Sequence, residues 1–251
     1  GNEKLPEIQG LNTLDISEVT DMTALFTNCK SLTSDALACT ANWKLPSKSQ
    51  SLFMGCESLT TANFASNWDV SDVIYMKQLF YGCKQLTQVN LSKWNVSKAL
   101  ELQNMFDGCG KLTELKINFT VNNANLNAFI SGCSSLTDTS NMVLSGTTSD
   151  INYFAYGVPT TTLDLSGLDM SAATNAIGIY TFINSKITEF YPPTNINVNI
   201  DIRHTTTLST DSIVRIFNSI MTTTETKTII LSNGTLNKLT EEQIAIATNK
   251  G

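Results

Sequence analysis

Phe80-Tyr81-Gly82-Cys83-Lys84-Gln85-Leu86 is one copy of a pattern, Phe-x-x-Cys-x-x-Leu, that returns through most of the chain. The four clear copies have Cys29, Cys56, Cys83 and Cys109, at spacings of 27, 27 and 26 residues. Weaker copies follow at Ile130/Cys133/Leu136, at Phe154/Gly157 and at Phe182/Ser185. A fixed period of about 20 to 50 residues is typical of repeat solenoids, so the pattern predicts the architecture.

Each repeat predicts one coil that contains a short strand and a short helical turn. Apolar residues in Leu86–Leu91 fit one face of a strand, and those in Leu102–Phe106 have helix-like spacing over one or two turns. Gly108 is expected to supply the positive φ that ends this turn. We therefore predict an α/β repeat solenoid of about seven coils, each burying its apolar side chains against its neighbours.

The period stops near residue 205 and a different pattern follows. Ser209 or Thr210 is expected to cap a helix, Lys227–Leu231 reads as a strand, and Thr240–Gln243 forms a capping box before a second helix. We predict three parts: a lead-in at residues 1–10, a solenoid at residues 11–205, and a helix-strand-helix cap at residues 206–251 that covers the last exposed strand.

Composition limits the classes of function. The formal net charge is −6 and the 16 basic residues are scattered, which argues against a nucleic-acid partner. No apolar run reaches the roughly 18 residues of a membrane span, so no transmembrane segment is predicted. The start at Gly1, and the abundance of Ser, Thr and Asn, favour an exported protein.

The sequence contains no motif that predicts catalysis. His204 is the only histidine and is expected to be structural or solvent-facing. Asp15, Asp69 and Asp169 stand in Asp-apolar-Ser steps and are interpreted as turn residues, since the calcium-binding coil pattern is missing. We predict that the protein is not an enzyme, and we assign no catalytic, cofactor-binding or metal-binding residues and no cofactor.

Two aligned columns of side chains leave alternatives open. The in-phase cysteines lack the Cys-x-x-Cys spacing of zinc or redox sites, and are expected to stack inside the solenoid as free thiols, although the geometry permits a disulfide between coils. Cys39 lies outside this column and is expected to be exposed. Trp43, Trp68 and Trp94 share one phase and form either a packed ladder or an exposed platform for sugar rings.

Two stretches carry a resemblance to a known family. Trp68–Thr87 and its close copy Leu14–Thr33 resemble the BspA-like leucine-rich repeats of bacterial surface proteins, and the likeness extends from residue 11 to about residue 190. The resemblance implies a right-handed leucine-rich-repeat superhelix, exported and often attached by a lipid or wall anchor outside this chain. It also implies adhesion to host proteins, matrix proteins or other cells. The family shares no catalytic residues, so the resemblance assigns none to this chain.

The predicted function is that of a non-catalytic bacterial surface protein that binds a macromolecule. Its expected partner is a protein or glycan on a host, matrix or neighbouring cell surface, and its expected location is the cell surface or the extracellular space. The alternative is a carbohydrate-binding module of a surface nutrient-capture system, suggested by the three tryptophans.

Overall fold

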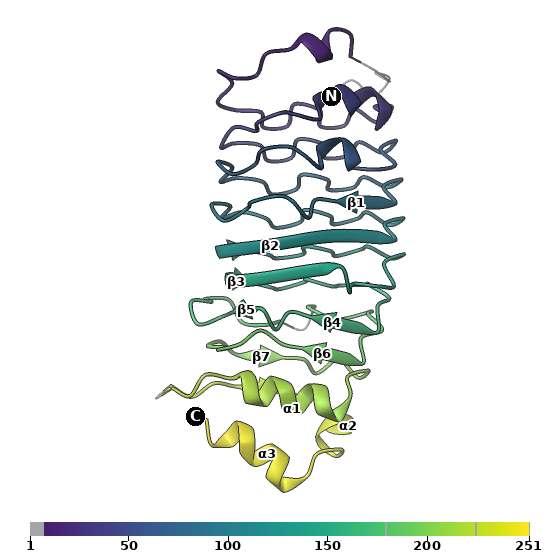
Figure 1. Ribbon diagram of the computed structural model, residues 1–251. Coiled ribbons are helices and arrows are strands. Elements are labelled where there is room, and N and C mark those ends of the chain that lie inside the picture. The colour runs from purple at the N-terminus through teal and green to yellow at the C-terminus, as the bar shows by residue number, and fades with distance from the viewer. Residues whose placement is uncertain (1–7, 179, 224, 251) are drawn as a thin grey trace.

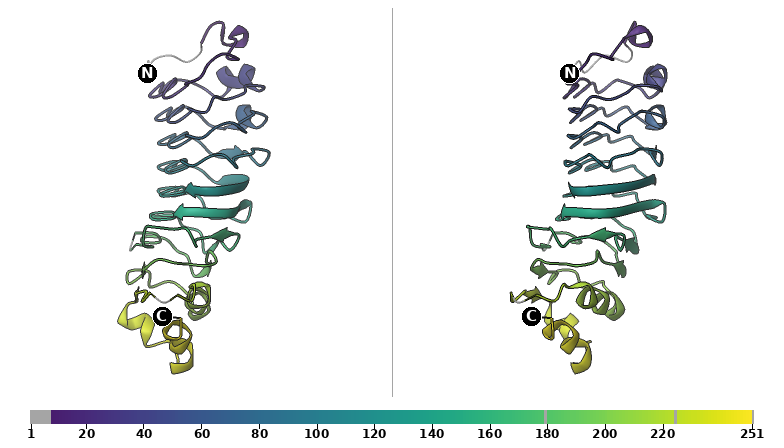
Figure 2. Two further views of the ribbon diagram at one scale, coloured as in Figure 1. Left: turned by 90° about the vertical axis from the view of Figure 1, so that its left-hand side faces the viewer. Right: turned by 60° about the vertical axis from the view of Figure 1, so that its left-hand side comes forward.

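The computed structural model describes residues 8–178, 180–223 and 225–250, which form a parallel β-solenoid followed by helices (Figure 1). The coils are flattened loops stacked into one elongated body, with the helices at the end opposite the first coils (Figure 2). The solenoid has about six turns. The predicted number, about seven, is too high because seven copies of the repeat mark delimit only six complete turns.

Regular strands are short except in the middle of the stack. The strands are β1 (Gln88–Asn90), β2 (Glu114–Asn125), β3 (Met142–Asp150), β4 (Thr162–Asp164), β5 (Leu168–Asp169), β6 (Glu189–Tyr191), β7 (Ile200–Asp201) and β8 (Ile229–Ile230). The helices are the 3₁₀ segments η1 (Leu11–Thr13), η2 (Asp35–Thr40) and η3 (Asn63–Ala65), and the α-helices α1 (Thr210–Ser219), α2 (Asn233–Leu236) and α3 (Glu241–Thr248). The η2 helix contains Cys39, which lies outside the cysteine column and is exposed.

All strand pairs are parallel, as stacked coils require. The strands form three sheets, ordered β1-β2-β3-β5, β4-β6 and β7-β8. Coils without regular strands are joined by isolated parallel bridges, such as the column Asp21, Lys48, Tyr75, Glu101 and Asn125. Each coil therefore depends on its neighbours for both backbone hydrogen bonds and apolar burial.

The predicted helical turn of each coil is not helical. Asn104, in the middle of the segment, has a φ of 56°, and Ala24, Ser51, Gln78, Ala128 and Tyr153 have the same left-handed conformation. The segment's amides bond to the next coil instead: Asn104 donates to the carbonyl of Asn127 (2.8 Å) and Phe106 to that of Phe129 (3.0 Å). Gly108 has a φ of 75°, which confirms the predicted turn-ending glycine.

The repeated cysteines form an interior column, as predicted. All six cysteines are free thiols; Cys39 is exposed, and the five in-phase cysteines are buried. From the second coil on, each thiol donates a hydrogen bond to the phenylalanine carbonyl of the preceding coil, as Cys83 does to Phe53 (3.2 Å). The column thus joins neighbouring coils by a hydrogen bond as well as by packing.

One assignment in this column is wrong by one residue. The amide of Gly132 donates to the carbonyl of Tyr156 (2.8 Å), which aligns Gly157 with the turn-ending glycine rather than with cysteine. Gly157 accordingly has a φ of 70°. Val158 takes the cysteine position and is completely buried, and Ser185 takes it in the next coil as predicted. The position accepts an apolar valine, so its role is packing.

The three tryptophans form a packed ladder. Trp43 stacks on Trp68 (ring centroids 5.8 Å apart) and Trp68 on Trp94 (6.5 Å). All three are at most 7% exposed, and the indole N–H of Trp68 donates to the carbonyl of Thr40. Phe119 continues the ladder in β2. Buried indoles cannot stack on a sugar, so the interpretation of the tryptophans as a sugar platform is wrong.

The two long strands were not predicted. In β2, Leu115, Ile117, Phe119 and Val121 are buried and alternate with exposed polar residues. This coil and the next lack the tryptophan corner of the earlier coils, and β2 and β3 run straight across the front of the body (Figure 1). The repeats that contain β2 and β3 are shorter than the earlier repeats, and a continuous strand takes the place of the corner at the tryptophan position.

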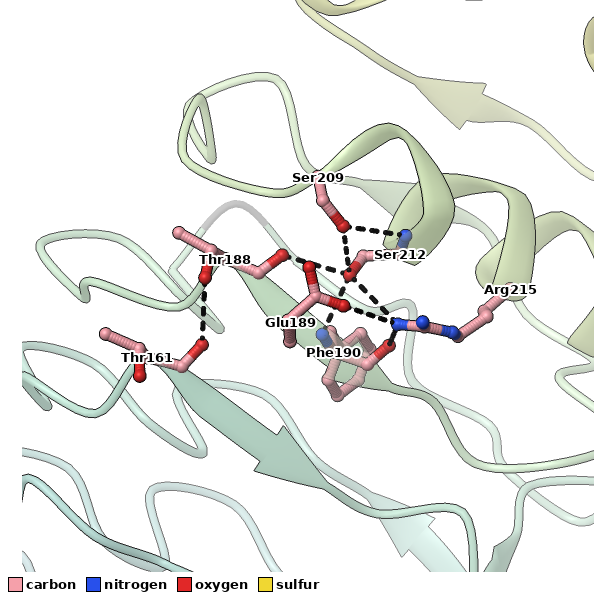
Figure 3. Close-up of polar contacts among 7 residues, drawn as sticks. All are labelled: Thr161, Thr188, Glu189, Phe190, Ser209, Ser212 and Arg215. Atoms are coloured by element: carbon pink, nitrogen blue, oxygen red, sulfur yellow. Dashed lines mark hydrogen bonds and ion pairs between the residues drawn. The ribbon is translucent and has the colours of Figure 1, made fainter.

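The C-terminal helices begin directly after the last coil of the solenoid. Ser209 caps α1 by accepting the amide of Ser212, and Thr240 and Gln243 form the predicted capping box of α3. The hydroxyl of Ser212 donates to the carbonyl of Thr188 (3.0 Å) and accepts the amide of Phe190 (2.9 Å), as Figure 3 shows. One hydroxyl thereby satisfies two backbone groups at the edge of β6 that another strand would otherwise pair.

Candidate functional site: a groove where the sheet divides

A groove opens between β3 and β4 because their coils differ in shape. β3 runs straight, whereas the following coil turns a corner at Asp164, whose carboxylate accepts the amide (2.9 Å) and hydroxyl (2.6 Å) of Ser166. β3 pairs with that coil only at Gly146 and Thr147, through β5, while β4 pairs with β6. In this fully described part of the chain, the first half of β3 therefore faces β4 without pairing with it.

A close approach of two chain segments marks the inner end of the groove. A Cβ atom on Gly167 would lie 2.3 Å from the carbonyl oxygen of Leu144, so the corner passes directly against β3. Beyond this point the segments separate and enclose a cavity of about 680 Å³. Eight of its fifteen lining residues carry hydroxyls on serine or threonine: Thr137, Thr139, Ser140, Ser145, Thr160, Thr161, Thr162 and Ser166.

Two buried threonines form the floor of the groove. The hydroxyls of Thr139 and Thr160 both donate to the carbonyl of Thr162, each at 2.8 Å. Thr139 and Thr160 are 7% and 2% exposed. Their hydroxyls occupy the acceptor that a neighbouring strand would use, so the division of the sheet is a satisfied, stable arrangement rather than a packing defect.

The charged residues in the groove lining are both acidic. Asp138 accepts the amide of Ser140 (2.8 Å), and Asp164 accepts that of Ser166. The hydrogen bonds from the backbone and side chain of Ser140 lower the pKa of Asp138 below its usual value, which keeps this carboxylate ionised. One oxygen of each carboxylate holds its turn, which fixes the direction of the group.

Tyr191 closes the rim of the groove on the side of the last coil. The guanidinium of Arg215 lies 4.3 Å from the centre of the Tyr191 ring, a cation–π contact. Arg215 also forms an ion pair with Glu189 at 2.9 Å (Figure 3). This pair lowers the pKa of Glu189, so the positive charge of Arg215 is neutralised locally and the lining keeps its acidic character.

The structure also shows where the residues lie that were considered as catalytic or calcium-binding candidates in the sequence. His204 is exposed near the end of the solenoid. Asp15, Asp69 and Asp169 each accept the amide of the serine two residues on, which confirms their interpretation as turn residues. None of these residues lies in the groove lining.

The sequence did not predict the groove, although it contains two signals. Apolar and polar residues alternate through β2, and the repeat shortens after Cys109; both indicate straight coils. The stretch Leu163-Asp164-Leu165-Ser166 then indicates a coil that turns a corner again. A transition between the two shapes predicts strands that cannot pair along their full length. Neither signal specifies where the lining side chains point.

Metal-binding clusters and membrane-spanning helices are both absent from the described residues. Within that part of the chain, no group of three or more His, Cys, Asp and Glu side chains is placed to hold a metal ion. None of the described helices combines the length and the apolar character that crossing a bilayer requires.

Comparison with known proteins gives two family matches. Residues 2–47 and 42–143, together more than half of the chain, match the family described as "Mycoplasma protein of unknown function, DUF285". Residues 102–216 match the "BspA type Leucine rich repeat region (6 copies)", and this match contains the whole groove lining. No curated protein and no solved structure matches the chain.

Proposed function

Because this chain belongs to the Mycoplasma DUF285 family and carries BspA-type leucine-rich repeats, we propose that it is a non-catalytic surface protein that binds a macromolecular partner. BspA-type proteins are generally associated with surfaces, and leucine-rich-repeat solenoids typically serve binding rather than catalysis. The partner is a protein on a host cell, in the matrix or on a neighbouring cell, and the binding protein is exported.

The groove between β3 and β4 is the observation that carries this proposal. Here the sheet divides and exposes a cavity of about 680 Å³. Val143, on β3, is 50% exposed in the lining, and Tyr191 is 38% exposed at the rim. Aromatic side chains are enriched in protein-binding surfaces, and Tyr191 places one beside the exposed Val143 in this lining.

The proposal also includes the larger organisation of the chain. We propose a right-handed superhelix at residues 11–205, preceded by a lead-in at residues 1–10, of which residues 1–7 lie outside the described residues, and followed by a C-terminal cap at residues 206–251. The contacts of Ser212 and Arg215 support the capping role, because they satisfy backbone groups along the edge of β6 that faces α1 (Figure 3).

A binding panel tests the function. The full chain is applied, at physiological salt, to immobilised matrix and cell-surface proteins, together with Val143→Glu and Leu100→Glu. Both positions are exposed apolar residues, at 50% and 47%, but only Val143 lines the groove. We expect a bound protein that is lost with Val143→Glu and kept with Leu100→Glu. Absence of binding across the panel contradicts the proposed function.

A further inference from the structure

The unpaired edge of β3 is the starting point for an inference about the partner. Ile117 of β2 donates to the carbonyl of Asn141 (3.1 Å), and Gly146 donates to the carbonyl of Gly167 in the following coil (3.0 Å). Backbone groups along a strand alternate between its two neighbours, so even-numbered residues of β3 face the following coil. Leu144 therefore directs its amide towards the groove, whereas its carbonyl lies against Gly167 and the amide of Met142 already donates to the carbonyl of Thr139 (2.9 Å).

The facing edge of β4 also directs backbone groups into the groove, but the carbonyl of Thr162 already accepts the hydroxyls of Thr139 and Thr160. Thr188 and Glu189 donate to the carbonyl of Thr161, and Leu165 donates to that of Tyr191 (2.8 Å), so the odd-numbered residues bond to β6. Thr162 and Asp164 consequently face β3. The groove lies between two strand edges of the same orientation, and an extended chain is the partner structure that satisfies such edges by main-chain hydrogen bonds.

The charge of the lining narrows the choice of partner. Asp138 and Asp164 are its charged residues, and Arg215 at the rim is neutralised by Glu189. A ligand with a lysine or arginine side chain gains two carboxylate acceptors that their turns already orient. The hydroxyls of the lining supply further acceptors and donors for a peptide backbone.

We propose that the groove between β3 and β4 binds an extended segment of the partner protein, added along the edge of β3, with a basic side chain held by Asp138 and Asp164. This inference rests on the proposed function and specifies the chemistry of the partner. This binding mode requires main-chain hydrogen bonds and recognition of a basic side chain at the same site. Non-specific adhesion to the solenoid surface would require neither.

A peptide library provides the test. Random linear peptides displayed on phage are selected on the full chain, and the enriched peptides are synthesised and titrated against it. The variants are Asp138→Asn and Asp164→Asn, with Asp15→Asn as the matched control, because Asp15 holds the same serine turn away from the groove. Asparagine keeps the turn acceptor, so the variants fold, as circular dichroism will verify.

The expected result is enrichment of peptides with lysine or arginine. Each groove variant should weaken their binding about tenfold, Asp15→Asn should leave it unchanged, and N-methylation of alternate peptide amides should abolish it. Failure to enrich such peptides overturns the inference, as does binding that ignores the groove variants. Binding of neutral polysaccharides that the groove variants abolish overturns it as well. A partner protein found in the panel whose binding ignores both aspartates overturns this inference alone, and leaves the proposed function standing.

Discussion

Ser212→Ala is the substitution that tests how the last coil is closed. The Ser212 hydroxyl is completely buried, donates to Thr188 and accepts from Phe190. Alanine leaves the buried Phe190 amide without a partner, which costs about 1–3 kcal/mol, and removes one bond of about 1 kcal/mol from the Thr188 carbonyl. That carbonyl keeps the amide of Ser209 (2.8 Å). Alanine also favours the helix by about 0.5 kcal/mol, so the net loss lies between about 1.5 and 3.5 kcal/mol.

Amide hydrogen exchange measures this loss where it occurs. In a solenoid the end coil can open separately from the rest, so the Phe190 amide should exchange at least about tenfold faster in Ser212→Ala. Ser219→Ala is the control, because Ser219 is the other serine of α1 and its hydroxyl makes none of the described hydrogen bonds. Equal exchange of Phe190 in the two variants would refute the idea that the Ser212 hydroxyl replaces a strand.

Three further predictions concern the solenoid itself. Gly146→Ala should lower the free energy of unfolding by about 3 kcal/mol or more in urea titrations, because φ is 92° and the new Cβ would lie 2.0 Å from the carbonyl oxygen of Val121. Gly234→Ala should not, because its new Cβ would make only an ordinary contact with the Ser232 hydroxyl, at 3.9 Å. In native protein, Ellman's reagent should titrate one thiol rapidly, that of Cys39, since the other five are buried; rapid reaction of several thiols would contradict the interior column. Two lysines lower the pKa of Asp72 to about 2, so its contribution is present above its unfolded pKa of about 4 and is lost as the pH falls towards 2. Asp72→Asn should flatten this part of the stability–pH curve, and an unchanged curve would contradict the ion pairs.

The interior of the solenoid could be predicted because its side chains repeat with the fold. The period of the cysteines predicted their stacking inside the solenoid, and Ser185 takes the cysteine position that the period assigns to it. The register failed at Gly157 because glycine fits both the turn and a small core position, and only the hydrogen bond from Gly132 to Tyr156 decides between them. The helical turn was wrong because helix-like spacing of apolar residues does not specify φ, and Asn104 and its equivalents are left-handed.

The groove could not be predicted because it results from a mismatch between coils. Each coil alone satisfies its own pattern, whether straight like β3 or cornered at Asp164. The groove depends on which backbone groups of β3 pair with the following coil. The register between the two coils decides this, and neither segment's sequence specifies that register. The same holds for Ser212, whose role depends on α1 lying against β6.

The most direct test of the account is an exchange footprint of the full chain bound to a protein partner captured in the binding panel. We predict slowed amide exchange in β3 and in β4, at Leu144 and Thr162 in particular, with the first coils unchanged. Protection confined to the first coils, or spread evenly over the solenoid, would contradict the claim that the divided sheet is the binding site.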